Sequence, residues 1–380
     1  MRIGIDTYPL IGQYAGIGIY LYNIIKYLEK IDKENEYFLY APNAIKSFEY
    51  NPKWRIRITK GFFNKSGTFW KQTRARKDLL KDKIDLFWAP NAILPANLPN
   101  SIKTVLTVHD LTYVLYPKTL KWDNKIIFPL FFRKSLKKAG EIIAVSESTA
   151  NEIRKFIPEI NNKISIIYEG ISGRFKLIDK YEAKKYISKE FNISQKYILT
   201  VLTLEPRKNL NNLLKAFLIL IRDNPRLDYQ LLIAGGSGWR NSNIYKTYQE
   251  LNLNSKQVKF LGYVHSDDLI ELYSGAEIFV FSSLYEGFGL PPLEAMACGT
   301  PVVASDIPVF REILGDAALL VDPFAPEKIA NAIYRVLTDN ALAKNLMQKG
   351  IERIKLFSWE TTAKETLGIF EKIIRRKNNG

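Results

Sequence analysis

Residues 276–322 constrain the fold of this 380-residue chain more tightly than any other segment. The segment opens on the apolar run 278–281, flanked by polar residues, which is typical of a buried strand in a parallel sheet. Residues 284–292 are rich in glycine and proline, and Pro292 suits the first position of a helix, where a missing N–H leaves no bond unmade. We therefore expect the first turns of a helix over residues 293–298.

The predicted helix should end at Gly299, and a second strand should follow over residues 301–305. In the loop before the helix, Gly287 and Gly289 allow backbone conformations that other residues resist. The free N–H groups of such a loop and of the helix start favour an anion. The segment therefore predicts a unit of strand, glycine loop, helix and strand with an anion site.

Two glutamates stand on either side of this anion site. Glu286 lies in the loop, at the carboxyl end of a strand, where open α/β sheets bind ligands. Glu294 lies about one turn into the helix, where its carboxylate can accept hydrogen bonds from both hydroxyls of a diol such as ribose. A phosphate between two carboxylates that bind hydroxyls describes a nucleotide sugar. The alternative is a pair of surface glutamates near a helix start.

The segment resembles the E-x7-E signature of the retaining GT-B glycosyltransferases of family 4, with Glu286 and Glu294 at its acidic positions. The resemblance implies that Glu286 contacts the donor sugar and that Glu294 contacts the nucleotide ribose. It further implies donor contacts from the loop residues Gly287, Phe288, Gly289 and Leu290.

A second motif lies between a strand expected over 197–201 and a helix expected over 210–220. It holds the adjacent cations Arg207 and Lys208, which can clamp a diphosphate because arginine offers a two-pronged donor and lysine a point charge. The motif is similar to the EPRKN of the same transferases, where this pair holds the pyrophosphate. The alternative is an ordinary basic surface pair.

Three further positions resemble family contacts with the donor. Gly16 and Gly18 lie in a loop between a first strand and a helix, in AGIGIY, which is similar to the family's GGIGRY and implies a backbone contact to phosphate. Val264 lies in a turn near which the family binds the base, and its neighbour His265 is expected to be structural.

His109 follows a strand expected over 103–108, on the edge of the sheet that binds ligands. Its sequence, VHD, resembles a strand end of the same family, where the histidine lies near the donor sugar. The resemblance implies a catalytic role for His109, and the alternative is a structural histidine.

Charge is distributed unevenly along the chain. Residues 1–150 hold 24 Lys and Arg against 13 Asp and Glu, or +11, while the remainder holds 31 against 26, or +5. The aromatic residues Phe62, Phe63, Phe69 and Trp70 are interleaved with eleven basic residues in one stretch. These are Lys53, Arg55, Arg57, Lys60, Lys65, Lys71, Arg74, Arg76, Lys77, Lys81 and Lys83. Such a composition is typical of a contact with an anionic membrane surface, although nucleic acid and a merely solvated helix face are alternatives.

Cys298 is the single cysteine, which excludes an internal disulfide and suits a reducing compartment. The N-terminus is too soon interrupted for a signal peptide, and the apolar run near 126–132 contains Pro129 and is short of a membrane span. We expect a cytoplasmic protein, peripheral at the inner face of the membrane.

The resemblance covers nearly the whole chain and implies an α/β fold of two Rossmann-like domains facing across a cleft, the GT-B arrangement. The N-terminal domain (1–170) would bind the acceptor, and the C-terminal domain (186–357) the nucleotide sugar. Residues 171–185 are expected to be a linker, and 358–380 a helix that crosses back to the N-terminal domain.

The implied reaction is transfer of a hexose, with retention, to a hydroxyl of a glycan or lipid-linked acceptor. VHD, TLEPRKN and GDAAL are most similar to the mannosyltransferase group, which implies GDP-mannose; UDP- and dTDP-sugars remain open. No D-x-D triplet occurs, so we expect neither a metal nor another cofactor. The alternatives are a glycoside hydrolase using Glu286 and Glu294, and a non-enzymatic protein that binds anionic lipid or nucleic acid.

Overall fold

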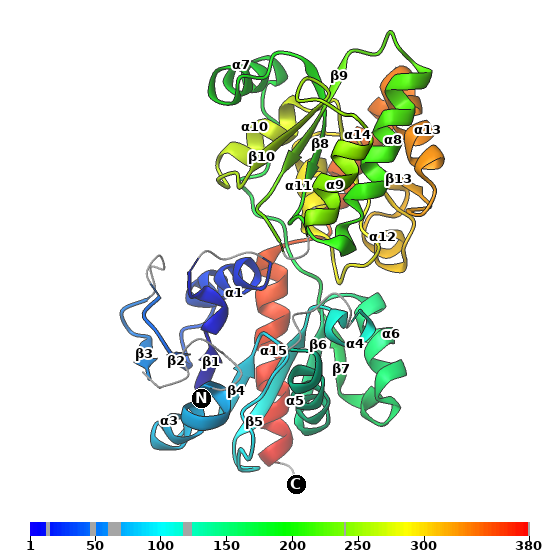
Figure 1. Cartoon of the computed structure of the whole chain (residues 1–380). Coiled ribbons are helices and arrows are strands. Elements are labelled where there is room, and N and C mark those ends of the chain that lie inside the picture. The colour runs from blue at the N-terminus through cyan, green and yellow to red at the C-terminus, as the bar shows by residue number, and fades with distance from the viewer. Residues whose placement is uncertain (13–15, 46–50, 60–69, 117–123, 239–240, 379–380) are drawn as a thin grey trace. The chain divides into compact units, whose positions relative to one another are not determined.

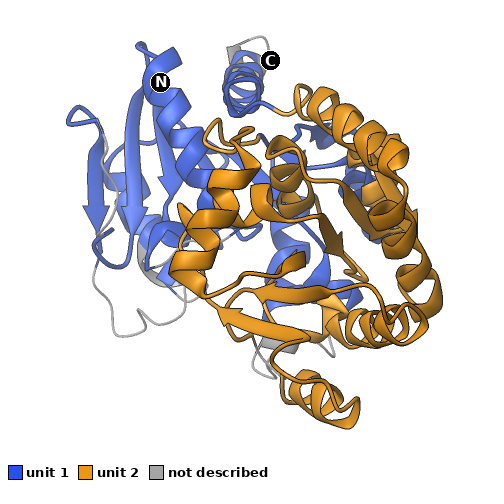
Figure 2. Cartoon of the chain, turned by 90° about the horizontal axis from the view of Figure 1, so that it is seen from above, with its two compact units in different colours: residues 1–170, 358–380 blue, residues 171–357 orange. Residues whose placement is uncertain are grey.

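The computed structural model describes residues 1–12, 16–45, 51–59, 70–116, 124–238 and 241–378 (Figure 1). The chain forms two compact units (Figure 2). Unit 1 comprises Met1–Gly170 and Ser358–Gly380, and unit 2 comprises Ile171–Phe357. Each unit contains a parallel sheet with helices packed against it, as the sequence predicts for a Rossmann-like domain.

Unit 1 is built on a seven-stranded sheet in the order β3-β2-β1-β4-β5-β6-β7, in which all neighbours are parallel. The order reverses between β1 and β4, so the loops that follow these two strands leave the same edge in opposite directions. The strands are β1 (Arg2–Asp6), β2 (Glu36–Ala41), β3 (Arg55–Ile58), β4 (Leu86–Ala89), β5 (Lys103–Val108), β6 (Glu141–Ala144) and β7 (Ile164–Ile166).

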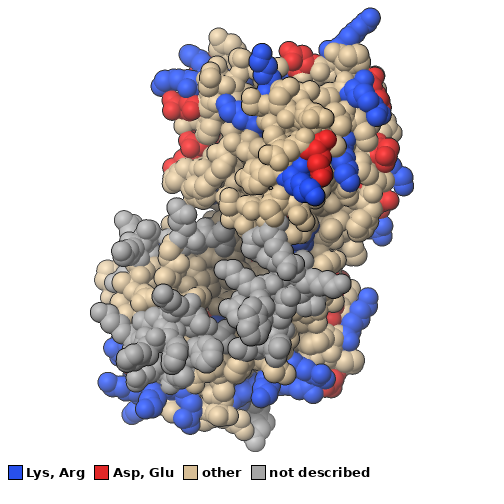
Figure 3. Space-filling model, viewed as in Figure 1, with Lys and Arg blue, Asp and Glu red and all other residues tan. Residues whose placement is uncertain are grey.

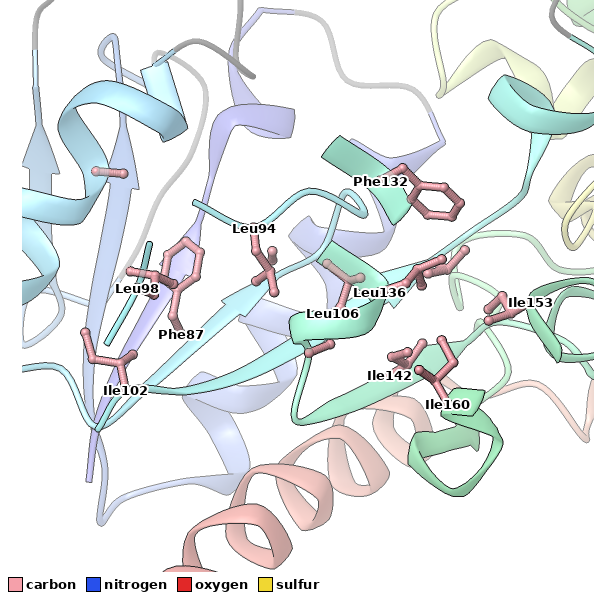
Figure 4. Packing of buried hydrophobic residues seen from close by; sticks show 14 of the residues in the cluster. Phe87, Leu94, Leu98, Ile102, Leu106, Phe132, Leu136, Ile142, Ile153 and Ile160 are labelled. Carbon is pink, nitrogen blue, oxygen red and sulfur yellow. The ribbon is translucent and has the colours of Figure 1, made fainter. Parts of the chain in front are cut away.

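Helices cover both faces of this sheet, as two successive residues of β4 show. Phe87 belongs to a buried cluster with residues of α3 and α5, including Leu136 (Figure 4). Trp88 points to the opposite face, where its ring lies 6.2 Å from that of Tyr20 on α1 and 5.6 Å from that of Phe370 on α15. The helices of unit 1 are α1 (Ile17–Ile31), α3 (Arg76–Lys81), α4 (Thr112–Leu115), α5 (Asn124–Lys138), α6 (Glu147–Phe156) and α15 (Trp359–Asn378).

Unit 2 is built on a six-stranded sheet in the order β10-β9-β8-β11-β12-β13, again with parallel neighbours only. Here the order reverses between β8 and β11. The strands are β8 (Lys196–Val201), β9 (Tyr229–Ala234), β10 (Val258–Gly262), β11 (Ile278–Phe281), β12 (Val302–Ser305) and β13 (Ala318–Val321).

The helices of unit 2 pack against one another. Helix α8 packs against α9 and α13, α7 packs against α10, and α11 packs against α10 and α14; α13 and α14 also contact each other. Helix α8 shows why they pack, because its buried residues recur at helical spacing from Leu210 to Leu220. The helices are α7 (Lys180–Phe191), α8 (Leu210–Asp223), α9 (Ser242–Glu250), α10 (Asp268–Gly275), α11 (Leu290–Ala297), α12 (Pro308–Ile313), α13 (Pro326–Thr338) and α14 (Asn340–Ile354).

The segment expected to be a linker, residues 171–185, differs in the structure. It belongs to unit 2, and its last residues form the start of α7. The helix begins here because the Asp179 side chain accepts hydrogen bonds from the N–H groups of Tyr181 and Glu182. Charged residues and Gly173 interrupt the apolar residues of this segment, so its sequence resembled that of a connection.

Candidate functional site

The loops after β8 and β11 leave the carboxyl edge of the unit 2 sheet at the point where the strand order reverses, and hydrogen bonds join them. The N–H of Leu284 donates to the carbonyl of Arg207 at 2.9 Å. The Ser282 hydroxyl donates to the carbonyl of Lys208 at 3.2 Å. The Arg207 guanidinium donates to the carbonyl of Tyr285 at 2.6 Å. The two predicted motifs therefore form one structure, in the place where open α/β sheets bind ligands.

Glu286 lies between the two predicted phosphate-binding cations. Its Oε1 is 2.6 Å from Lys208 Nζ, and its Oε2 is 3.0 Å from Arg207 Nη1. Arg207 Nη2 also lies 2.7 Å from Glu205 Oε1. The Arg207, Lys208 and Glu286 side chains are only 11–13% exposed, so water screens these ion pairs weakly. We call these four residues the charge cluster.

The charge cluster determines the ionisation of Glu286. Burial alone would raise its pKa, but the positive charges of Lys208 and Arg207 outweigh burial and lower the pKa of Glu286 to about 2. Glu286 is therefore an anion at all physiological pH values. Such a carboxylate accepts hydrogen bonds from ligand hydroxyls and cannot serve as a proton donor.

The loop ends at Gly289, which has a φ of +106°. A Cβ at this position would lie 2.6 Å from Cε1 of Phe310, so the backbone conformation and the close packing both require glycine. Helix α11 begins directly after it, at Leu290, earlier than the start at residue 293 that the sequence analysis expected. The left-handed glycine lets the chain enter the helix at once, and prolines are tolerated in its first turn.

Glu294 lies on α11 in a different setting from that of Glu286. Its Oε2 accepts a hydrogen bond of 2.9 Å from the Tyr273 hydroxyl on α10. Burial raises the pKa of Glu294 to about 7, against the opposing effects of the Tyr273 hydrogen bond and the Arg174 charge. The two predicted carboxylates thus have opposite tendencies, one fixed as an anion and the other near its titration point.

The remaining predicted donor contacts in unit 2 lie on the loops that follow strands. Phe288 is buried, and its ring lies 5.6 Å from that of Phe357. Gly287 lies beside it. Val264 follows β10 and is also buried, whereas His265 is exposed beside Asp267.

Gly16, Gly18 and His109 belong to unit 1. Gly16 precedes α1 with a φ of +47°, and Gly18 is buried in the first turn of that helix. The residue before Gly16, Ala15, lies outside the described residues. The helix begins at Ile17, so Gly18, which the sequence analysis placed in the loop, lies in α1 instead. Contact of either glycine with a ligand remains a prediction.

His109 directly follows β5, and groups of unit 1 surround its ring. Nδ1 lies 2.8 Å from Glu169 Oε1, and Nε2 lies 3.0 Å from the carbonyl oxygen of Pro90. The Tyr20 ring meets the imidazole edge-on, with 4.7 Å between the centroids. Both ring nitrogens are engaged within unit 1 in this structure, so the side chain is held in one orientation. A role for His109 at the donor sugar stays a prediction.

Among the residues that contact predicted site residues, sequence reasoning assigned no role to Glu205, Glu169 and Tyr273. Glu205 was part of a motif but had no assigned role, Glu169 lay in a segment interpreted as the end of the first domain, and Tyr273 lay on an ordinary amphipathic helix. The contacts of Glu169 and Tyr273 depend on packing between segments that are distant in sequence, so no local pattern predicts them. Glu205 lies only two residues from Arg207, in the same motif.

The basic stretch between residues 53 and 83 differs from the sequence expectation in one respect. Lys71 and Trp70 are buried, and Lys71 Nζ lies 2.9 Å from Asp6 Oδ2 and 2.6 Å from Asn91 Oδ1. These two residues are therefore unavailable to a membrane. Residues 60–69 and the Arg74 side chain lie outside the described part. The exposed basic residues of the stretch are Lys53, Arg55, Arg76, Lys77, Lys81 and Lys83.

Figure 3 shows Lys and Arg side chains along the lower edge of unit 1 in that view, where Figure 1 places α3 and the end of α15. Among the residues with described coordinates, no helix combines the length and apolar character needed to span a membrane. The same residues contain no group of three or more His, Cys, Asp and Glu placed to hold a metal.

Comparison with protein families assigns both halves of the chain. Residues 183–353 match the family described as Glycosyl transferases group 1, and residues 14–172 match Glycosyltransferase Family 4. Together these matches include every predicted site residue.

Among curated proteins, the O-antigen chain mannosyltransferase B of Escherichia coli is 32% identical over 293 residues, covering 77% of this chain and 76% of that protein. The O-antigen chain mannosyltransferase RfbU of Salmonella typhimurium is 32% identical over 234 residues, or 61% of this chain and 60% of that protein. The serotype-specific mannosyltransferase WbdA of Escherichia coli is 29% identical over 72% of this chain, which spans only 34% of that longer protein.

Solved structures of similar fold span the whole chain at low identity. The sucrose-phosphate synthase of Thermosynechococcus elongatus aligns with a TM-score of 0.79 and 23% identity, covering 99% of both chains. WaaG, a glycosyltransferase involved in lipopolysaccharide biosynthesis, aligns with a TM-score of 0.76 and 14% identity over 97% of this chain and 99% of its own. These two likenesses show the shared GT-B fold.

Proposed function

Because this chain belongs to the family 4 glycosyltransferases, we propose that it transfers a hexose from a nucleoside-diphosphate sugar to a hydroxyl of a glycan or lipid-linked acceptor. The proposed hexose is mannose and the proposed donor GDP-mannose, since the similar proteins from Escherichia coli and Salmonella typhimurium are O-antigen mannosyltransferases. The process served would be the synthesis of a cell-surface polysaccharide or glycolipid.

The observation that carries this proposal is the charge cluster at the switch point of unit 2. Within it, Arg207 and Lys208 each lie within ion-pair distance of the Glu286 carboxylate, on the ligand-binding edge of the sheet. A diphosphate needs the cations and a neighbouring hexose needs a hydroxyl acceptor, so a nucleotide sugar uses both kinds of group. In this assignment Arg207 and Lys208 bind the diphosphate, and Glu286 binds sugar hydroxyls.

The same arrangement supports a mechanism for the chemical step. Negative charge develops on the diphosphate as the glycosidic bond breaks, and a preorganised Arg207 and Lys208 stabilise that charge electrostatically. We propose that the departing phosphate oxygen takes the proton of the acceptor hydroxyl, so that attack and departure occur on one face and the configuration is retained. The two cations supply the charge that a divalent metal supplies elsewhere, and the proposed reaction uses no metal.

A glycoside hydrolase would use the same two glutamates differently. One low and one raised pKa is also the pattern of a glycosidase nucleophile and acid, so the pKa shifts alone do not distinguish the two enzymes. The cations do distinguish them. Lys208 and Arg207 occupy both oxygens of Glu286, which suits binding of a diphosphate donor and leaves the carboxylate a poor nucleophile.

The test is a donor assay over GDP-mannose, GDP-glucose, UDP-glucose, UDP-N-acetylglucosamine and dTDP-rhamnose, with release of the nucleoside diphosphate as the readout. We expect one donor to be consumed preferentially, with full activity in excess EDTA. Lys208→Ala should reduce kcat/KM by about two to four orders of magnitude, because one preorganised charge is lost. Hydrolysis of simple glycosides with no turnover of any sugar nucleotide would support the hydrolase instead. Loss of turnover in EDTA that Mn²⁺ restores would contradict the metal-free step.

We further propose that the exposed basic residues of the 53–83 stretch bring the enzyme to an anionic membrane surface. Lys53, Lys77, Lys81 and Lys83 are exposed, and among the described residues only Lys81 interacts with a neighbouring acid, Asp82. Each exposed lysine near the surface contributes about 1 kcal/mol of attraction to anionic lipid. A membrane location would also place the enzyme beside a lipid-linked acceptor.

A further inference from the structure

We propose that Tyr273 is a positioning residue for the nucleoside end of the donor. Its hydroxyl holds one oxygen of Glu294 and thereby presents the other oxygen to the vicinal hydroxyls of a ribose. The inference rests on the proposed function, which assigns the ribose to Glu294. It adds a residue on a different helix that decides how well Glu294 performs this task.

Tyr273 is suited to positioning because its own place is fixed. The residue is fully buried, and its ring meets those of Phe175 and Phe279 edge-on at centroid distances of 5.9 and 5.4 Å. Its carbonyl accepts a hydrogen bond of 2.6 Å from the Thr300 hydroxyl. Both the backbone and the ring are therefore held, so the phenol oxygen has one location from which to reach Glu294.

The direction of the hydrogen bond follows from the environment. Burial and the charge of Glu294 raise the pKa of Tyr273 well above its usual value, so the phenol keeps its proton and donates it. Glu294 Oε2 receives this proton donor at 2.9 Å. The lone pairs of Oε1 can then accept from ligand hydroxyls, and the ionised carboxylate offers more acceptor sites than the protonated carboxyl does.

The groups that face Glu294 come from three elements. Tyr273 approaches from α10, Arg174 from the segment before α7, and Cys298 from the end of α11. Burial raises the pKa of Cys298 to about 12, so the thiol is neutral. Among the residues that the structure describes, the Tyr273 hydrogen bond and the Arg174 charge oppose the burial that raises the pKa of Glu294.

Tyr273 therefore has two effects on Glu294. It restricts the rotation of the carboxylate, and it extends the ionised form to lower pH. Without the phenol hydroxyl, more of the carboxyl would be protonated near neutral pH, and the protonated group offers one acceptor fewer to a diol. Loss of the hydroxyl should thus weaken ribose binding most at low pH and little at high pH.

Calorimetry with GDP, UDP and their 2′,3′-dideoxy analogues tests this between pH 6 and 8.5. Whichever of GDP and UDP the wild type binds should bind more weakly as the pH falls through about 7. Its dideoxy analogue should bind weakly at every pH. Tyr273→Phe should bind the ribonucleotide about two- to fivefold more weakly at pH 7, because loss of the hydrogen bond raises the pKa of Glu294 and leaves less of the carboxyl ionised. It should approach wild type at pH 8.5 and leave the affinity for the dideoxy analogue unchanged.

Tyr197→Phe is the matched control. Tyr197 is equally buried in unit 2, and its hydroxyl donates to the carbonyl of Leu272, beside Tyr273, at 2.9 Å. Removing this hydroxyl disturbs the same helix without touching Glu294, so its pH curve should coincide with that of wild type. The comparison of two nucleotides in one preparation also corrects for any fraction of a variant that fails to fold.

The inference is overturned if Tyr273→Phe retains the wild-type pH curve and the wild-type preference for ribose over dideoxyribose. A different result would count against the proposed function instead. If Glu294→Gln binds the ribonucleotide as tightly as wild type does, Glu294 is not the ribose ligand, and the inference falls with that assignment.

Discussion

At the scale of single residues, Glu286 and Glu294 show how surroundings divide one chemical group into two tasks. Ion pairs with Lys208 and Arg207 keep Glu286 charged, so its charge stabilises the folded unit. Glu294 is buried with one hydrogen bond and a nearby guanidinium, so ionising it costs folding free energy. The ionised form of Glu294, which accepts hydrogen bonds from ligand hydroxyls, thus destabilises the ligand-free protein.

This difference predicts a pH-dependent gain in stability for Glu294→Gln. A carboxyl whose pKa rises from 4.5 to about 7 on folding takes up protons, so its contribution is full below pH 4.5 and is lost as the pH rises through 7. The melting temperature of Glu294→Gln relative to wild type should therefore increase between pH 4.5 and 7 and stay level above it. Scanning calorimetry across this range measures the difference, and a difference that does not vary with pH would contradict the burial of Glu294.

Among single residues, the charge cluster was largely predictable from sequence, and the partners of the titrating groups were not. Arg207, Lys208 and Glu286 lie in motifs at strand ends, and parallel strands bring such ends to one edge. Tyr273 contacts Glu294 because α10 packs beside α11, and no sequence pattern in either helix predicts that contact.

At the scale of elements, the site depends on two loops whose backbones fix the side chains. The loop after β8 is anchored by Asn209, whose side chain donates to the carbonyl of Pro323 at 2.7 Å. The loop after β11 ends at Gly289, where a left-handed backbone starts α11 against the ring of Phe310. The sequence indicated both loops but placed the start of α11 too late and missed that α7 begins within the expected linker. The start of α11 depends on prolines tolerated in its first turn, and the start of α7 on one capping aspartate. Signals of one or two residues are easily missed in a sequence.

Gly289→Ala should therefore damage both stability and activity. The left-handed conformation alone costs an alanine about 1–2 kcal/mol, and its Cβ would lie 2.6 Å from Phe310 Cε1. We expect a lower melting temperature for unit 2 and a lower kcat, since displacing the loop moves Glu286. Gly236→Ala is the control, because its Cβ would meet no atom within 4 Å. Equal melting temperatures for the two variants would show that the loop accommodates a side chain.

At the scale of the whole molecule, the chain repeats one sheet architecture in its two units. Both sheets have the strand order of a Rossmann-like domain, and most of the excess of basic residues, +11 of +16, lies in the first 150 residues. The composition shows where basic residues are concentrated along the chain, but it cannot distinguish a buried lysine from an exposed one. Lys71 is buried with Asp6, and only the three-dimensional structure separates it from its exposed neighbours.

The exposed part of the basic stretch yields a prediction for membrane binding. Lys53→Glu, Lys77→Glu and Lys81→Glu together should release the protein from vesicles of equal parts phosphatidylglycerol and phosphatidylcholine, as measured by sedimentation. Wild-type binding should weaken with salt, because exposed charges are screened over roughly 8–10 Å at physiological ionic strength. The control reverses Lys256 and Lys344, which are exposed in unit 2. If the triple variant still bound the vesicles, the basic stretch would be a solvated face and not a membrane contact.

The central claim is that unit 2 binds a nucleotide sugar with Glu286 at the hexose and Glu294 at the ribose. Calorimetric titration of GDP and UDP into Glu286→Ala and Glu294→Ala tests it most directly, because a free nucleoside diphosphate contains the ribose and lacks the hexose. Glu286→Ala should bind the diphosphate at least as well as wild type while its kcat falls sharply. Glu294→Ala should bind the same diphosphate at least about tenfold more weakly, as expected when hydrogen bonds to a charged group are lost. Equal affinities in the two variants would contradict this division of roles.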